Sequence, residues 1–200
     1  MLSTVPFFYR DSWIQKLSDG HAGTLQTLAI MRWLCRRDYR SSFVGWKISS
    51  ILSSYRSKGL SPYQLDIEGN LTGDQSPVDP VDPLFFFARD SIRFEEDVGP
   101  NGEENFERLA DFQRTTELGY GDCDDKCIWL ATALLNCNIP VRFRVQSYTG
   151  RTWDHVYCEC WKAWRWVPLD PTADGHTGIM AEPGWRQPLP ATGMEMIYPI

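Results

Sequence analysis

The first quarter of the chain carries apolar residues at helical spacing. Three-residue steps separate apolar positions between residues 21 and 37, and this period predicts a helix. A second apolar stripe predicts a helix over residues 42–57, which Gly59 and Pro62 then terminate. The apolar positions of the first helix are Leu25, Leu28, Met31 and Leu34. We therefore predict an N-terminal helical region over residues 1–65.

Residues 66–114 are predicted to contain a linker followed by two helices. Residues 66–83 are rich in Gly, Pro and Asp, which is typical of a loop or linker. An apolar run then predicts a buried helix over residues 84–92, followed by a turn at 97–101. Residues 103–114 have apolar side chains at helical spacing and predict another helix.

The second half contains one strongly periodic helix followed by strands. Residues 122–137 have helical periodicity, which Pro140 ends. Three strands, expected to be antiparallel, follow at 141–145, 154–161 and 165–169. From residue 173 onward Gly and Pro dominate, so residues 173–200 are predicted to be an irregular tail. Helices followed by a helix and strands indicate the α+β class, with the main domain over residues 84–172.

Composition and charge narrow the range of functions. Twenty basic and 26 acidic residues give a net charge of −6, which argues against binding nucleic acid through its phosphates. The N-terminus lacks a basic leader followed by an apolar run, so we expect no signal peptide and synthesis in the cytoplasm. No stretch approaches the roughly 18 apolar residues of a membrane span. The six cysteines are then expected to be thiols.

Cys123 has the sequence setting of a reactive thiol. It opens the predicted helix over residues 122–137, and the positive end of the helix dipole favours a thiolate. Backbone N–H groups of the first helical turn can bind a developing oxyanion. Gly121 allows the chain to enter sharply and a substrate backbone to approach closely. Cys123 is therefore the candidate nucleophile.

A thiol nucleophile needs a base, and the base needs an orienting acceptor. Of three histidines, only His155 falls in a predicted strand. Asp170 stands at the end of the next predicted strand, where a hairpin partner reaches His155. Alternation along the strand puts His155 and Glu159 on one face and Val156, Cys158 and Cys160 on the other.

Four stretches of the second half form a recognisable series: Gly121-Asp122-Cys123-Asp124-Asp125, Ala133-Leu134-Leu135 with Ile139-Pro140-Val141-Arg142-Phe143, Asp154-His155-Val156-Tyr157, and Trp166-Val167-Pro168-Leu169-Asp170-Pro171-Thr172. Together they resemble the transglutaminase-like cysteine protease superfamily, most closely its branch in bacteria and tailed phages. The resemblance covers residues 84–172. It implies a papain/transglutaminase-like core, in which the helix bearing the nucleophile packs on a small antiparallel sheet.

The resemblance also implies a papain-type triad, in which Cys123 is the nucleophile, His155 the general base and acid, and Asp170 its orienter. The reaction is then acyl transfer from an amide of a peptide or protein, through a thioester, to water or to an amine. Many transglutaminases place an oxyanion-binding Trp upstream of the nucleophile, and this chain has none between Trp46 and Trp129. Gln113 is the candidate substitute.

Metal binding is the rival interpretation of the same residues. Two pairs of cysteines offer four thiolates for zinc, at spacings that fit no common zinc knuckle, and a zinc site there excludes the triad because His155 would face away. The acidic residues around Cys123 suggest calcium, but they lack the Gly and distal Glu of an EF-hand loop and are explained as helix-capping charges. We therefore expect no metal and no cofactor. The paired cysteines are Cys123 with Cys127 and Cys158 with Cys160.

A second hypothesis makes the chain a structural component of a tailed-phage particle, at the head–tail junction or the tail tip. It draws on the phage-like branch and on the aromatic, Pro-rich residues 182–200, which are typical of an assembly arm. Its partners would be other phage structural proteins, and the triad would be kept with little turnover.

Overall fold

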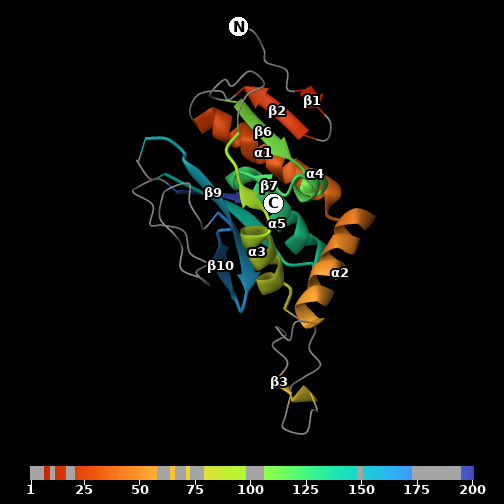
Figure 1. The fold of residues 1–200 in the computed structure, drawn as a ribbon. Helices are drawn as coiled ribbons and strands as arrows, with labels where there is room; N and C mark the ends of the chain where they lie inside the picture. The colour runs from red at the N-terminus through yellow and green to blue at the C-terminus, as the bar shows by residue number, and fades with distance from the viewer. Residues whose placement is uncertain are drawn as a thin grey trace.

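Helix α5 (Cys123–Asn136) lies at the centre of the molecule, between a four-stranded sheet and the remaining helices (Figure 1). This computed structural model describes residues 7–9, 12–16, 21–57, 64–65, 71–72, 79–97, 106–147, 151–172 and 195–200. The architecture is α+β, as predicted, with helices packed on an antiparallel sheet. No helix within these ranges is both long enough and apolar enough to cross a bilayer.

The main sheet has the strand order β10-β9-β8-β11, with every neighbouring pair antiparallel. The three predicted strands are confirmed as β8 (Val141–Gln146), β9 (His155–Lys162) and β10 (Arg165–Leu169). The prediction of an irregular tail is wrong for β11 (Glu195–Pro199), which pairs with β8. An unpaired edge of β8 would expose its backbone groups, and this pairing satisfies them.

Both N-terminal helices are confirmed, as α1 (His21–Asp38) and α2 (Ser42–Ser57). The helix predicted at 84–92 is α3 (Val81–Asp90). All three contact α5, and their apolar faces share one buried core with the sheet. The N-terminal helices therefore pack directly on the helix that carries Cys123.

The helix predicted over residues 103–114 is wrong. Residues up to 110 form β6 (Phe106–Ala110), which pairs with β2 (Ser12–Lys16), and β2 pairs with β1 (Phe7–Tyr9). Helix α4 (Phe112–Leu118) begins only after Asp111, whose side chain accepts the backbone N–H of Arg114 as an N-cap. Pairing with a strand some ninety positions earlier in the chain overrides the local helical spacing.

Trp129 anchors α5 against its neighbours. Its ring stacks between Phe87 of α3 and Phe112 of α4, at centroid distances of 5.0 and 4.9 Å. Its Nε1 donates to Thr116 Oγ1 at 2.8 Å, so the buried indole has no unpaired polar group. Stacked aromatic rings of this size fix the position of the helix start that carries Cys123.

Two short pairings complete the described elements. Strand β5 (Arg93–Phe94) runs parallel to β7 (Tyr120–Gly121), and this brings the residues after β5 beside the start of α5. Strands β3 (Gln64–Leu65) and β4 (Leu71–Thr72) form an antiparallel pair within and beside the predicted linker. The β5–β7 pairing matters for the site, because it places Asp97 near Asp122.

Candidate active site

Cys123 occupies the first turn of α5, as the sequence predicts. Asp122 is the N-cap, and its Oδ1 accepts the backbone N–H groups of Asp124 and Asp125 at 3.1 and 3.2 Å. A Cβ on Gly121 would lie 2.5 Å from the Cβ of Asp125, which a real structure does not tolerate. The glycine therefore lets the chain enter the helix tightly.

The sulfur of Cys123 lies against strand β9. The backbone N–H of Val156, the residue that follows His155, hydrogen-bonds to the Cys123 side chain. Cys123 is partly exposed, whereas four other cysteines are buried. The fold thus brings the start of α5 and the start of β9 together, with Cys123 reachable from outside.

His155 and Asp170 form a buried pair. His155 Nε2 lies 2.7 Å from Asp170 Oδ2, and the two residues are 7% and 8% exposed. Thr172 holds the other carboxylate oxygen, since its hydroxyl and its backbone N–H both donate to Asp170 Oδ1, at 2.6 and 3.0 Å. Both oxygens of Asp170 are therefore hydrogen-bonded.

These contacts set the ionisation of Asp170 and the tautomer of His155. Burial works against the charged carboxylate, but the imidazole of His155 and the hydrogen bonds from Thr172 outweigh it and lower the pKa of Asp170. An ionised carboxylate only accepts hydrogen bonds, so Nε2 of His155 carries the proton. In the neutral ring, Nδ1 is then the basic nitrogen.

The opposite side of Cys123 is acidic. Burial, and then the negative charges of Asp124, Asp122 and Glu107, raise the pKa of the Cys123 thiol well above its ordinary value. Asp125 is fully buried in the same part of the structure. Its Oδ1 accepts the backbone N–H of Ala110 at 2.6 Å, and its Oδ2 lies 3.4 Å from Arg108.

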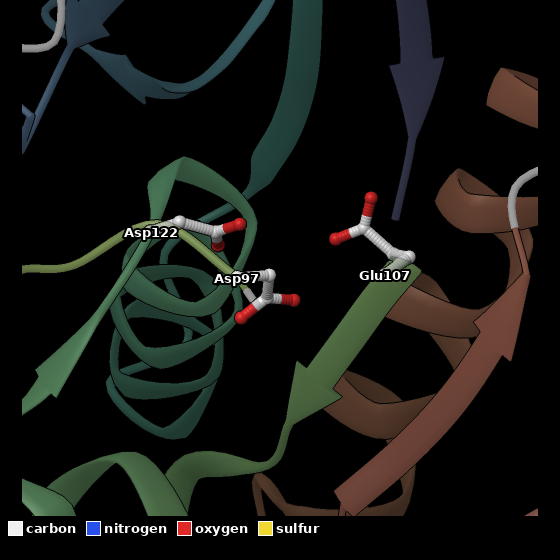
Figure 2. A group of neighbouring side chains, drawn as sticks. All are labelled: Asp97, Glu107 and Asp122. Atoms are coloured by element: carbon white, nitrogen blue, oxygen red, sulfur yellow. The ribbon is translucent and has the colours of Figure 1, made fainter. Parts of the chain in front are cut away.

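Three carboxylates from separate parts of the chain meet beside α5. Ligand oxygens of Asp97, Glu107 and Asp122 all lie within 4.8 Å of one another. Figure 2 shows the three side chains turned toward one another, Glu107 from β6 and the other two from beside the start of α5. Asp97 and Glu107 were not predicted as site residues, because the sequence pattern put them in a turn and on a helix. Only the pairings of β6 and β5 bring them here.

The remaining candidates have other partners. Cys127 donates to the carbonyl of Val156 at 3.4 Å, and Cys158 donates to the carbonyl of Cys127 at 3.5 Å. Gln113 is exposed on α4 and donates to Glu117 Oε1 at 2.8 Å. Among the described residues no hydrogen bond joins Gln113 to Cys123, so its role as oxyanion donor stays a prediction. Thr172 was not predicted to have a role either, although its position two residues after Asp170 is typical of a local bond between a side chain and the backbone.

Comparison with known families identifies the superfamily of the fold. Residues 67–171, more than half of the chain, match the family described as the transglutaminase-like superfamily. The chain belongs to that superfamily. No curated protein matches it significantly.

Two solved structures are distantly similar. One is a chain from Cytophaga hutchinsonii named provisionally as a cysteine protease, with 15% identity and a TM-score of 0.35 over 46% of this chain and 30% of that one. The other is the Rad4–Rad23 complex crosslinked to undamaged DNA, with 17% identity and a TM-score of 0.38 over 79% of this chain and 41% of that one. The chain therefore spans less than half the length of either. The superfamily assignment rests on the sequence match.

Proposed function

We propose that the chain is a thiol acyl-transfer enzyme, a peptidase or amidase, in which Cys123 attacks an amide carbonyl. The observation that carries the proposal is the buried His155–Asp170 pair, 2.7 Å apart, at the start of the strand that contacts Cys123. A histidine whose Nε2–H is fixed by a carboxylate presents Nδ1 as the general base.

The first half of the reaction forms the thioester and releases the amine. His155 Nδ1 takes the proton of the Cys123 thiol, and the sulfur bonds to the carbonyl carbon. The N–H groups of Asp124 and Asp125 already donate to Asp122. The backbone N–H of Cys123 itself is therefore the first-turn donor for the oxyanion. The imidazolium of His155 then gives its proton to the leaving amine as the C–N bond breaks, leaving a thioester.

The second half reverses these roles. His155 takes a proton from water or from an amine as it attacks the thioester carbonyl, and the C–S bond breaks. The proton then returns to the sulfur of Cys123, which restores the thiol. Asp170 and Thr172 keep the imidazole in place throughout, and the ion pair of Cys123 with His155 has to offset the raised pKa of the isolated thiol.

Alkylation by iodoacetamide, mapped by mass spectrometry, tests the nucleophile. Cys137 is the internal reference, because it is also partly exposed but lies at the far end of α5. We expect Cys123 to react faster than Cys137 at neutral pH. His155→Ala should slow Cys123 by about tenfold or more, since it removes the base. His21→Ala, at an exposed histidine outside the pair, should leave the rate unchanged.

Equal labelling of Cys123 and Cys137, or an unchanged rate in His155→Ala, would contradict the proposal. Turnover is measured separately with fluorescently labelled casein for hydrolysis and with dansylcadaverine incorporation for transfer to an amine. Cys123→Ala should abolish whichever of the two the wild-type protein shows.

A further inference from the structure

Helix α1 presents apolar side chains to the outside of the molecule as well as to the core. Its inner face, with Leu28, Met31 and Leu34, is buried. On the side that faces away from the core, Leu25 and Trp33 are 37% and 47% exposed. A surface helix ordinarily has one apolar stripe, which faces the core, and polar residues on the opposite face. Packing inside the chain therefore does not account for the outer apolar residues of α1.

The exposed residues of α1 form one stripe that is apolar at first and basic at its end. Leu25, Ala29 and Trp33 follow one another at four-residue steps, so they lie on one side of the helix. Arg36 and Arg40, which are both exposed, continue this side into the last turn of α1 and the turn after it. These five residues are called the outer stripe of α1 below.

The basic end of the outer stripe contrasts with the acidity of the chain as a whole. Residues 32–40 include four arginines and one aspartate, whereas the chain has a net charge of −6. Arg37 is already balanced, since it pairs with the one aspartate of this segment at 2.6 Å and with Asp111 at 2.5 Å. Arg36 and Arg40 form no ion pair with a carboxylate within the described ranges. The outer stripe thus carries positive charge that is available to an anionic partner.

An anionic bilayer has the chemistry that matches both ends of the outer stripe. Basic side chains near a membrane surface gain free energy from anionic headgroups, and Trp prefers the region between headgroups and hydrocarbon. Apolar residues on one side of a helix that lies along a membrane enter the edge of the hydrocarbon, as Leu25 and Ala29 would. A nucleic acid would attract the arginines but offers no hydrocarbon layer to Leu25 and Ala29. The apolar end therefore favours a lipid surface.

We propose that the outer stripe of α1 docks the protein onto the surface of an anionic lipid bilayer. Trp33 would lie at the level of the headgroups, with Arg36 and Arg40 against lipid phosphates. Helix α1 lies outside residues 67–171, which match the superfamily, so this surface belongs to the N-terminal part of this chain. Because α1 packs on α5, docking would fix the orientation of the helix that carries Cys123 relative to the membrane.

Flotation of the full chain with lipid vesicles tests this surface. Vesicles of phosphatidylcholine are compared with vesicles of phosphatidylcholine mixed with phosphatidylglycerol, at low and at high salt. We expect binding to the mixed vesicles only, and we expect salt to weaken it, since salt screens the attraction between arginines and headgroups. Arg36→Gln combined with Arg40→Gln should weaken binding by about tenfold or more, and Trp33→Ala by about fivefold or more.

The control changes the same residue types elsewhere on the surface. Trp164 is 91% exposed in the turn between β9 and β10, which lies apart from α1 (Figure 1), and the exposed Arg165 follows it. Trp164→Ala combined with Arg165→Gln should bind the mixed vesicles as the wild type does. Thermal melts check the fold of every variant. The double arginine variant changes only exposed side chains, so it decides the question if Trp33→Ala does not fold.

Three results would overturn the proposal. The first is a wild-type protein that binds no mixed vesicles, or binds both kinds of vesicle equally. The second is unchanged binding in both outer-stripe variants, or an equal loss in the control variant. The third is binding of a fluorescent DNA oligonucleotide without binding of vesicles, which would show that the arginines serve a polyanion and not a bilayer.

Discussion

The two sides of Cys123 solve the problem of buried polar groups in opposite ways. On the β9–β10 side, His155, Asp170 and Thr172 satisfy one another, with both carboxylate oxygens hydrogen-bonded. On the β6 side, carboxylates face carboxylates, and Glu107 Oε1 has no hydrogen-bond partner among the described residues. The same residue type, an aspartate, has its pKa lowered at position 170 and raised at position 122.

Only one of the two sides of Cys123 satisfies the hydrogen-bonding groups of its own residues. The histidine side is pre-organised, because each donor meets an acceptor. On the acidic side, Arg108 neutralises part of the charge, and the hydrogen bond between Glu107 and Asp124 needs a proton on one of the two carboxyl groups.

The largest expected effect comes from Asp125, the fully buried acidic residue that is paired with Ala110 and with Arg108. Asp125→Ala leaves the buried N–H of Ala110 without its acceptor and takes a counter-charge from Arg108. We expect a loss of about 3 kcal/mol in the free energy of unfolding, measured by urea denaturation. Asp90→Ala, at an exposed residue, should change it by less than about 0.5 kcal/mol. Equal effects in the two variants would contradict the partnered role of Asp125.

Asp170→Asn should destabilise the protein, because it removes the charge that pairs with His155. Because the folded pKa of Asp170 is lowered, its charge stabilises the protein above the unfolded pKa of about 3.9, and this contribution is lost as the pH falls through the folded value. At neutral pH we expect a loss of about 2 kcal/mol relative to the wild type, which shrinks as the pH falls below about 4 and through the lowered folded pKa. Urea denaturation at several pH values measures it. A difference that stays constant from pH 7 to pH 3 would show that charge is not the cause.

Thr172→Val keeps the shape of the side chain and removes one of the two donors to Asp170 Oδ1. We expect a loss of about 1 kcal/mol in the free energy of unfolding and a several-fold slower alkylation of Cys123, since His155 is less firmly oriented. Thr172→Ser, which keeps the hydroxyl, should restore both values. A slower alkylation that Thr172→Ser does not restore would point to packing instead of the hydrogen bond.

The smallest effect, and the one of opposite sign, belongs to Glu107. Glu107→Gln should raise the free energy of unfolding at neutral pH by about 0.5–1 kcal/mol, because the amide donates to Asp124 without the proton that the carboxyl has to take up. Thermal and urea melts compare it with Glu117→Gln, which should be neutral. A loss of stability in Glu107→Gln would show that the Glu107 carboxylate is already balanced in the folded protein.

The interpretation as a phage particle component stays a prediction of the sequence. Most of residues 182–200, on which it depends, lie outside the described residues, apart from β11. The expected cytoplasmic synthesis and the expected partners likewise stay predictions. Mass spectrometry of purified particles, showing whether the chain is present at fixed stoichiometry, checks the particle role.

By itself, the sequence determined the features that depend on local spacing. The helical periods of α1, α2 and α5, the alternation of β8, β9 and β10, and the tight entry at Gly121 all follow from neighbouring residues, so each could be predicted. The pairing of His155 with Asp170 was also within reach, because the two residues lie on adjacent strands of one hairpin.

Only the tertiary structure decided which charges surround Cys123. Residues 106–110 have helical spacing, and their pairing with Ser12–Lys16 turned them into a strand that delivers Glu107 to the site. The parallel β5–β7 pair did the same for Asp97. Such contacts join positions far apart in the chain, and no local pattern encodes them. The sequence thus predicted a cysteine at a helix start beside Asp122 and Asp124, and the fold added Glu107 to the carboxylates that raise the pKa of its thiol.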